Sequence, residues 1–381
     1  MVTPYLPPRL GGREYWVPQM SKELLSLGCD VKIYCANVSD FYANKASLEE
    51  GDYEGVPFVK ASTPIDINKY STPVTIPPFK HLKAFDPDII HIHEPNLILT
   101  TVLALYGKWI LKKKVVMHNY SDPFDWIGGS VAFKLFMKFY SRIHLLKLRV
   151  SDLVIVISEE YRDYARYFKR FKEKISIIPM CLADVFEQDP SIDKEPRTVL
   201  YAGRLDVRKG IEYLIRACAQ LENVKLLIAG SGEKEVTEFL HKEGEAAKGL
   251  NSSLSIEFLG KQNQEELNVL YNRSTVLVLP TADPTAETFG AVLLEAWATK
   301  TPVISANNQA PMKLIHESGG GLIAERANAQ DLAEKISEVL EDPALAASLG
   351  EKGFSFATKN YSFKENAVKL KKLYQTMLGT S

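Results

Sequence analysis

Long apolar runs and cysteines are both scarce in this chain of 381 residues. The longest apolar run, residues 97–111, is interrupted by Thr100, Thr101 and Lys108, so it is too short and too polar to span a bilayer. The four cysteines lie far apart and lack the spacing of a metal site, which favours reduced thiols in a cytoplasmic protein. We also expect no signal peptide.

An excess of charge of one sign is also absent. The formal net charge is −1, so the overall charge gives no indication of nucleic-acid binding. Apolar residues make up 46% of the chain and charged residues 24%, as in soluble globular proteins, and the length suffices for two domains. No expected strand is followed by a complete G-x-G-x-x-G, which disfavours a dinucleotide-dependent dehydrogenase.

The most informative stretch is residues 279–304. A β-branched run ends at Pro280 as a buried strand should, and after a polar loop Gly290 opens a helix that is apolar on nearly every face. Two carboxylates interrupt this apolar pattern, Glu287 in the loop and Glu295 within the helix. A buried carboxylate is costly unless a neighbouring group donates a hydrogen bond to it.

Between the two glutamates lie Phe289, Gly290 and Ala291, whose amides have no partner inside the helix. These amides and the helix dipole form an anion site, and Gly290 lets a phosphate approach closely. The stretch therefore predicts a phosphate site with one acid on either side. The alternative is structural: a solvated loop glutamate and a helix glutamate paired with a core arginine.

The second half of the chain predicts a parallel, doubly wound sheet, because strands alternate with helices from Thr198 onward. Arg204 and Lys209 follow its first strand, five residues apart, and we expect them to converge on one anion, the arginine as a fork and the lysine as a point charge. The expected strands are residues 198–202, 224–229, 255–259, 275–279, 302–305 and 321–324.

The first half of the chain also alternates strands and helices. Residues 1–4 have the pattern of the end of a strand rather than of a whole one, which leaves open whether residues precede Met1. Residues 114–117 form a strand that delivers His118 at its carboxyl end, where parallel sheets place their ligands. A structural histidine that caps the strand is the alternative.

A further strand, residues 88–95, ends in a polar segment. Its His91, His93 and Glu94 are of types that bind metals, but no further cluster of ligands accompanies them. The favoured interpretation is a strand end at a domain interface, and we expect no metal site.

Basic residues are concentrated in one part of the first half. Residues 101–175 contain 15 Lys+Arg and 7 Asp+Glu, and the helix expected at 130–150 combines these charges with aromatics. Such a block is compatible with an anionic membrane surface. An ordinary helix with buried aromatics and solvated lysines is the alternative.

Taken together, these motifs resemble those of family 4 glycosyltransferases, and the resemblance extends over nearly the whole chain. Its most specific parts are the E-x7-E pair Glu287 and Glu295 with Phe289-Gly290, and Gly203-Arg204-Leu205 with Lys209-Gly210. The resemblance implies an α/β protein of GT-B architecture, with two facing Rossmann-like domains. We expect domains at residues 1–183 and 184–353, followed by a helix from residue 354 that packs back on the first domain.

The family moves a sugar from a nucleotide diphosphate to an acceptor with retention at the anomeric carbon. By resemblance, the enzyme needs no cofactor and no obligatory metal, a UDP- or GDP-hexose is the donor, and a glycan or lipid-linked molecule is the acceptor. The implied catalytic residues are Glu287, His118, Arg204 and Lys209. The implied donor-binding residues are Gly12, Arg204, Lys209, Glu287, Phe289, Gly290, Ala291 and Glu295.

The chain departs from the family pattern at three positions. Lys300 stands where glycine is frequent, residues 308–311 replace a Gly-Gly loop near the donor, and residues 180–184 replace a common Asn-Gly-x-Asp. The identity of the donor sugar therefore stays open. Two alternative functions stay open as well: a nucleotide-sugar epimerase of the same architecture, and a binding protein that has lost catalysis. We expect the active-site cleft between the domains, hinge closure on donor binding, and membrane contact through residues 130–149.

Overall fold

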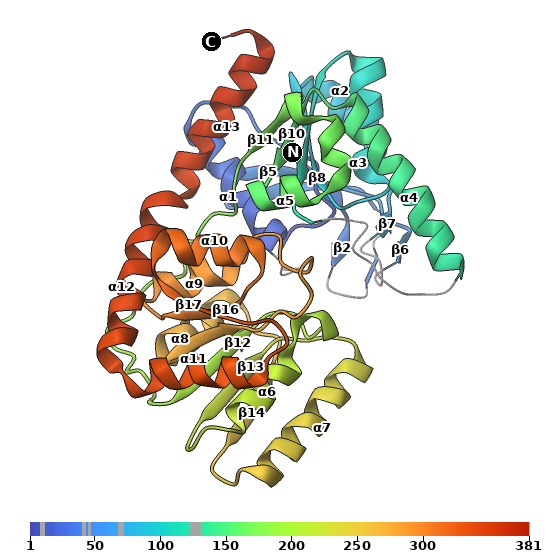
Figure 1. The fold of residues 1–381 in the computed structure, drawn as a ribbon. Helices are drawn as coiled ribbons and strands as arrows, with labels where there is room; N and C mark the ends of the chain where they lie inside the picture. Colours follow the sequence, from blue (N-terminus) through green and yellow to red (C-terminus); the bar gives the residue numbers. More distant parts are fainter. Residues whose placement is uncertain (8–11, 40–42, 45–46, 68–71, 122–130, 381) are drawn as a thin grey trace. The chain divides into compact units, whose positions relative to one another are not determined.

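The structure is a computed structural model, and it describes residues 1–7, 12–39, 43–44, 47–67, 72–121 and 131–380 (Figure 1). The chain forms two compact units. Unit 1 comprises Met1–Met180 and Phe363–Ser381, and unit 2 comprises Cys181–Ser362. Each unit contains its own parallel sheet with helices on both faces, so the α/β class expected from the sequence is confirmed.

Unit 1 is built on a mainly parallel sheet. Its edge strand β4 (Glu49–Tyr53) runs antiparallel to β5. Two small hairpins, β2–β3 (Val38–Ser39, Ala43–Asn44) and β6–β7 (Ile65–Ile67, Thr72–Val74), lie outside this sheet. The parallel strands are β1 (Ile33–Ala36), β5 (Val56–Ala61), β8 (Ile89–Glu94), β9 (Lys114–Asn119), β10 (Leu153–Val156) and β11 (Ile175–Ile177).

The first residues of the chain join the two halves of this sheet. The amide of Val2 donates to the carbonyl of His91 (2.7 Å) on β8, and the amide of Thr3 donates to the carbonyl of Tyr34 (2.9 Å) on β1. Val2 is 1% exposed. Residues 1–3 therefore act as a short central strand between β1 and β8, as the sequence pattern predicted.

Two groups of helices cover the two faces of the unit 1 sheet. One face packs against α1 (Gly12–Ser26) and α13 (Phe363–Leu378), and the other packs against α3 (Leu99–Leu105) and α4 (Val131–Val150). The π-helix η2 (Tyr106–Leu111) continues α3. The remaining elements of unit 1 are α2 (Phe79–Phe85), α5 (Glu159–Tyr164), η3 (Arg166–Arg170) and η4 (Lys172–Lys174).

Unit 2 contains six parallel strands in the order β14-β13-β12-β15-β16-β17. Each lies within one residue of the position expected from the sequence: β12 (Thr198–Ala202), β13 (Lys225–Ala229), β14 (Ser255–Gly260), β15 (Val276–Leu279), β16 (Val303–Ala306) and β17 (Gly321–Ala324). The central strands are runs of buried apolar residues, and all four residues of both β15 and β16 are buried, whereas the edge strands β14 and β17 are less covered.

Helices cover both faces of the unit 2 sheet (Figure 1). One layer consists of α6 (Ile211–Cys218), α7 (Lys234–Leu250) and α11 (Ala329–Glu341), whose apolar faces complete the core. The other layer consists of α8 (Gln264–Arg273), α9 (Ala291–Ala298), α10 (Gln309–Ser318) and α12 (Pro343–Asn360). A short 3-10 turn, η5 (Val207–Lys209), precedes α6.

The C-terminal region differs from the sequence expectation. A single amphipathic helix was expected from residue 354, but the chain forms α12 and α13 with a break at residues 361 and 362. At the break the carbonyl of Tyr361 accepts a hydrogen bond from the amide of Leu182 (2.8 Å), so it is not available to continue the helix. α13 then packs on α1 within unit 1, where Lys371 donates to the carbonyl of Leu27 (2.6 Å).

Lys300, where glycine is frequent in the family, has a left-handed backbone with φ of 55°. This conformation disfavours residues with a Cβ, which gives a physical reason for glycine at this position. In this chain the lysine side chain pairs with Glu351 on α12 (2.7 Å) and lies over the ring of Phe354. These contacts offset part of the backbone strain.

Candidate functional site

The carboxyl end of the unit 2 sheet has a topological switch point between β12 and β15. From β12 the chain proceeds outward to β13 and β14, whereas from β15 it proceeds in the opposite direction to β16 and β17. Open α/β sheets bind their ligands in the crevice at such a point. The loops that follow β12 and β15 contain Arg204, Lys209, Glu287 and Gly290, so the predicted residues of unit 2 lie around this crevice.

The two loops are held together by the main chain. The carbonyl of Arg208 accepts hydrogen bonds from the amides of Ala282 and Asp283, both at 3.0 Å. Gly210 has φ of 64°, and a Cβ at this position would lie 2.4 Å from the carbonyl oxygen of Pro280. The approach of the loops therefore requires glycine at residue 210, and the charged side chains sit on a fixed backbone.

Lys209 and Glu287 form an ion pair across the switch point. The Lys209 ammonium also donates to the carbonyl of Ala286 (3.0 Å), and the hydroxyl of Thr281 donates to Glu287 Oε1 (3.3 Å). The two charged side chains are 13% and 12% exposed, so they are largely shielded but still reach the surface. Glu287 is therefore ion-paired and largely shielded from solvent, unlike the solvated loop glutamate of the structural alternative.

Arg204 is placed differently from Lys209. Its side chain is exposed and forms no ion pair with any residue that the structure describes, while its carbonyl accepts a hydrogen bond from the hydroxyl of Tyr201 (2.7 Å). The neighbouring Arg208 pairs with Asp206 (2.9 Å). Lys209 is bound to Glu287 in this structure, so the convergence of Arg204 and Lys209 on one anion stays a prediction.

Glu295 accepts a hydrogen bond from the hydroxyl of Tyr271, on α8, at 2.7 Å. Tyr271 is completely buried and Glu295 is partly buried. Burial raises the pKa of Glu295 to about 7, although the Tyr271 hydrogen bond acts in the opposite direction. Within the described chain Glu295 forms no ion pair, so the alternative of a core arginine partner is wrong.

The N-terminus of α9 starts at Gly290, whose φ of 96° lies in the left-handed region. A Cβ on this residue would lie 3.3 Å from a side-chain carbon of Pro311, so the first turn of α10 packs closely against the start of α9. The Phe289 ring is 5% exposed and packs on Tyr361 with centroids 5.7 Å apart. Phe289 can therefore serve an anion only through its backbone, whereas Ala291 is partly accessible.

Gly12 and His118 belong to unit 1. Gly12 is exposed at the start of α1, and the loop before it, residues 8–11, lies outside the described residues. His118 ends β9 but its side chain is completely buried, edge-on to Trp16 and stacked on Tyr120. Burial lowers the pKa of His118 to about 3, so the imidazole is neutral.

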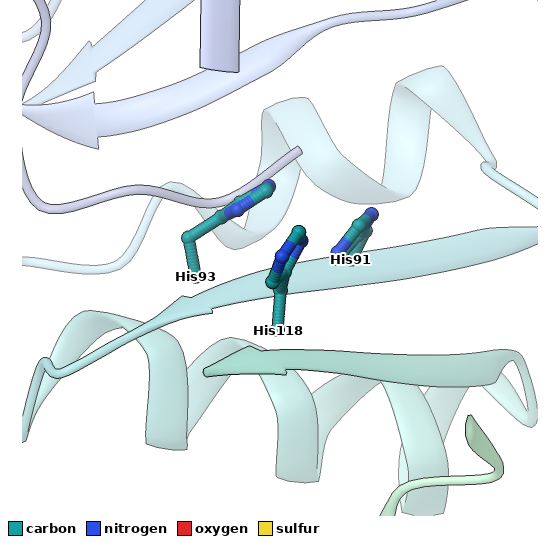
Figure 2. A group of neighbouring side chains, drawn as sticks. All are labelled: His91, His93 and His118. Atoms are coloured by element: carbon teal, nitrogen blue, oxygen red, sulfur yellow. The ribbon is translucent and has the colours of Figure 1, made fainter. Parts of the chain in front are cut away.

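His118 is part of a stack with His91 and His93, shown in Figure 2. One ring nitrogen from each of the three lies within 4.8 Å of the others, which raises the question of a metal site. The rings are nearly parallel, with interplanar angles of 11° to 32°, so their in-plane lone pairs do not converge. Hydroxyl groups of Tyr374 (2.5 Å) and Tyr120 (2.9 Å) bind Nδ1 of His91 and His93. The geometry suits a hydrogen-bonded stack better than a metal ligand set.

Glu94 lies apart from this stack, so the alternative grouping of His91, His93 and Glu94 is wrong. Glu94 is 1% exposed and pairs with Lys147 (2.5 Å), which is completely buried on α4. Lys147 also donates to the carbonyl of Asn96 (2.6 Å), and Thr100 donates to Glu94 (2.6 Å). Lys147 was counted in the basic block, but it is a core residue.

The surface of α4 is nevertheless both basic and apolar. Leu135 is 63% exposed and Phe139 is 54% exposed, and Lys138 and Arg142 are exposed on the same helix. The side chains of residues 131–134 lie outside the described residues. In the described chain, no helix combines the length and the apolar character needed to cross a membrane.

The sequence motifs did not identify two residues of the site, Tyr271 and Thr281. Tyr271 lies 24 positions before Glu295, and no local pattern links a helical tyrosine to a carboxylate on the next helix. Thr281 could have been found, since it is the first polar residue after a strand that ends at the switch point.

Two family models match the chain, one in each half. The model described as "Glycosyltransferase Family 4" matches residues 10–182, and the model described as "Glycosyl transferases group 1" matches residues 184–356. Between them they include every residue singled out from the sequence as a candidate site residue.

Similar proteins of known name are also glycosyltransferases. An uncharacterised glycosyltransferase of Methanocaldococcus jannaschii is 26% identical over 292 residues, which cover 71% of this chain and 78% of the relative. The D-inositol 3-phosphate glycosyltransferase of Corynebacterium aurimucosum is 25% identical, covering 96% of this chain and 90% of the relative. The phosphatidyl-myo-inositol mannosyltransferase of Mycolicibacterium smegmatis is 25% identical, with 77% and 72% covered.

Solved structures match the fold over its whole length. Sucrose-phosphate synthase from Thermosynechococcus elongatus has a TM-score of 0.77 at 21% identity and covers 100% of this chain and 99% of its own. HepE of Anabaena, in complex with UDP and glucose, has a TM-score of 0.73 at 16% identity, with 98% and 99% covered. The resemblance inferred from the motifs is confirmed, and the chain belongs to glycosyltransferase family 4, the group 1 glycosyl transferases, with the GT-B fold.

Proposed function

We propose that the chain is a retaining hexosyltransferase that moves a sugar from UDP or GDP to a glycan or lipid-linked acceptor. The observation that carries this proposal is the Lys209–Glu287 pair at the switch point, with Glu295 eight residues further along the chain, in α9. The names of the similar proteins, which act on inositol phosphate and phosphatidyl-myo-inositol, and the UDP bound by HepE support the same class of chemistry.

The cations and amides of unit 2 bind the donor diphosphate. Arg204 is exposed and forms no ion pair among the described residues, and the amides at the start of α9 follow the loop from the other strand of the switch point. Negative charge develops on the diphosphate as it leaves, so fixed cations and hydrogen-bonding amides at this point lower the activation barrier. Lys209 is occupied by Glu287 in this structure, and the diphosphate competes with that carboxylate for the ammonium.

The two glutamates bind the two sugars of the donor. Glu295 accepts hydrogen bonds from the ribose hydroxyls, which its buried carboxylate needs, and Glu287 binds hydroxyls of the transferred sugar. By family resemblance, Gly12 and His118 of unit 1 contact the donor as well. Because the His118 side chain is completely covered, that contact requires the groups above it to move.

The reaction needs no covalent nucleophile from the protein. The family resemblance implies displacement on one face of the sugar, in which the acceptor oxygen attacks as the diphosphate leaves and the leaving phosphate accepts the acceptor proton. The protein then contributes positioning and charge stabilisation, both of which the described geometry of unit 2 can supply.

A panel of nucleotide sugars tests the proposal. Wild-type protein is incubated with UDP-glucose, UDP-N-acetylglucosamine and GDP-mannose, and release of free nucleotide is measured with Glu287→Gln and Lys209→Met in parallel. We expect release from at least one donor, lost in both variants and retained in Lys234→Ala, which removes an 84% exposed lysine of unit 2. Equal release by wild type and Glu287→Gln would refute the proposed role.

The surface of α4 supports a membrane-associated acceptor. Leu135 and Phe139 expose apolar side chains next to the cations Lys138 and Arg142, and anionic lipid attracts such cations by about 1 kcal/mol each. We assign the enzyme to the cytoplasmic face of the membrane as a peripheral protein whose acceptor is carried by lipid, as in cell-surface glycan assembly.

Vesicle co-sedimentation separates this assignment from a soluble acceptor. The expected result is binding to vesicles with anionic lipid but not to neutral vesicles, with loss at high salt and in the double variant Lys138→Glu/Arg142→Glu. Lys234→Glu serves as the matched control on unit 2. If the protein stays in the supernatant with all vesicles, the membrane assignment is refuted and the soluble acceptor is the remaining interpretation.

A further inference from the structure

Thr281 is a junction between the loop after β15 and the loop after β16. It is completely buried, its hydroxyl donates to Glu287 Oε1 (3.3 Å), and its carbonyl accepts a hydrogen bond from the side-chain amide of Asn308 (2.7 Å). One residue thus links the carboxylate of Glu287 to the segment that follows the neighbouring strand β16.

Both groups that bind Glu287 approach the same oxygen. The Lys209 ammonium and the Thr281 hydroxyl donate to Oε1, and none of the residues that the structure describes donates a hydrogen bond to Oε2. The torsion at the end of a glutamate side chain is broad and has no strong preference of its own. Binding at Oε1 therefore sets the direction in which Oε2 is presented.

Asn308 uses its side chain in an unusual way for its position. It precedes α10 as the N-cap residue, where asparagine commonly accepts a hydrogen bond from the helix backbone, yet its side chain makes no such bond. It is 1% exposed and its amide is directed to Thr281 instead. Asn308 lies in the segment where this chain departs from the Gly-Gly loop of its family. The contact with Thr281 therefore depends on a side chain that the family pattern lacks at this place.

We propose that Thr281 and Asn308 are positioning residues that hold Glu287 so that Oε2 faces the hydroxyls of the donor sugar. The inference rests on the proposed function. When the diphosphate draws Lys209 away, the Thr281 hydroxyl becomes the remaining contact of Oε1, so its importance increases once the donor is bound. Asn308 acts one step further away, by fixing the backbone that carries the hydroxyl.

The test compares two substitutions at one position. Thr281→Val keeps the shape of the side chain and removes the hydroxyl that donates the hydrogen bond, whereas Thr281→Ser keeps this hydroxyl. The probes are turnover of UDP-glucose or GDP-mannose, whichever the wild type consumes, and calorimetric affinity for the free nucleoside diphosphate. We expect Thr281→Val to lower kcat about tenfold, as for loss of a hydrogen bond to a charged group, with nucleotide affinity within about twofold of wild type. Thr281→Ser should recover most of the loss.

Thr299→Val is the matched control for the loss of a buried threonine hydroxyl. Thr299 is 1% exposed at the other end of α9, where its hydroxyl donates to the carbonyl of Ala296 (2.8 Å), away from Glu287. Its turnover should match the wild type. Asn308→Ala provides a second, independent variant, with the same selective loss of kcat to a smaller extent, should Thr281→Val not fold.

The outcomes separate this inference from the proposed function. If Glu287→Gln abolishes turnover but Thr281→Val and Asn308→Ala retain it, the positioning role is refuted and the proposed function stands. If Thr281→Val weakens nucleotide affinity as much as it lowers kcat, the hydroxyl supports the loop as a whole, and the positioning role is again refuted. If Glu287→Gln retains full turnover, the proposed function fails, and this inference fails with it.

Discussion

Glu295 gives a prediction in which stability and function oppose each other. Burial disfavours the carboxylate and raises the pKa of Glu295 from its ordinary value of 4.5 to about 7. At pH values between 4.5 and about 7, Glu295 is therefore protonated in the folded protein and ionised in the unfolded chain. A raised pKa stabilises the fold fully below pH 4.5, and this contribution disappears as the pH rises through about 7.

The magnitude follows from the two pKa values. At 1.36 kcal/mol per unit, ionising Glu295 in the fold costs about 3 kcal/mol at high pH, of which about 2 kcal/mol is lost between roughly pH 5.5 and pH 8.5. Glu295→Gln removes this titration, and its side-chain oxygen can still accept the Tyr271 hydrogen bond. The variant should therefore gain stability relative to wild type on going from the lower to the higher pH.

Urea unfolding at the two pH values measures the effect, fitted to the transition of unit 2. The difference between Glu295→Gln and wild type is compared across pH, because all other titrating groups then cancel. We expect that difference to shift by about 2 kcal/mol in favour of the variant at the higher pH. Nucleotide affinity should change in the opposite sense, with weaker binding by the variant. A stability difference that is the same at both pH values would refute the assigned pKa and the argument built on it.

Four further results are expected. Wild-type affinity for UDP or GDP should fall about tenfold from pH 8 to pH 6, as Glu295 takes up a proton and can no longer accept from both ribose hydroxyls; a flat profile in calorimetry would contradict this. Arg204→Ala should lower kcat/KM by about 1.5–3 kcal/mol of transition-state binding, measured by donor release, and unchanged turnover would remove Arg204 from the diphosphate site. Gly210→Ala should lower the thermal midpoint of unit 2, because the new Cβ meets the Pro280 carbonyl at 2.4 Å, whereas the solvent-facing Gly249→Ala should not. Lys147→Met should destabilise unit 1 by about 3–5 kcal/mol by leaving Glu94 buried without its cation, and the double variant with Glu94→Gln should recover much of the loss in urea unfolding.

The sheet of unit 2 could be predicted from the sequence almost to the residue, for a physical reason. Strands that are covered on both faces must be continuously apolar, so runs such as 276–279 and 302–305 stand out between polar loops. The segment from 37 to 87 lacks that contrast, yet it contains α2 and several short strands. Its edge strand β4 consists of two glutamates, a glycine, an aspartate and a tyrosine, and its three central residues are exposed, so it carries no apolar signal.

The sequence predicts those site residues that lie in loops and whose type the function requires. It does not predict residues whose role depends on how the helices and strands pack. Lys209, Glu287 and Gly290 follow strand ends, and parallel strands bring such ends together. By contrast, the sequence could not reveal that Lys147 is a core residue, because a lysine in a basic helix resembles its solvated neighbours until Glu94 is placed beside it. Tyr271 could not be identified for the same reason, since its hydroxyl reaches Glu295 only because of the position of α8 relative to α9.

The Lys209–Glu287 pair gives the proposed diphosphate site a charge balance of its own. A loop that carries a lysine without a nearby anion would leave that cation unbalanced, and desolvation makes an unbalanced charge costly. Glu287 supplies the negative charge, and the Lys209 side chain is 13% exposed rather than buried, so it can still be reached from the solvent. Under the proposed function, a diphosphate competes with Glu287 for the ammonium, and the carboxylate that it displaces becomes available to sugar hydroxyls. Thr281 is then the contact that keeps Glu287 in place during this proposed exchange.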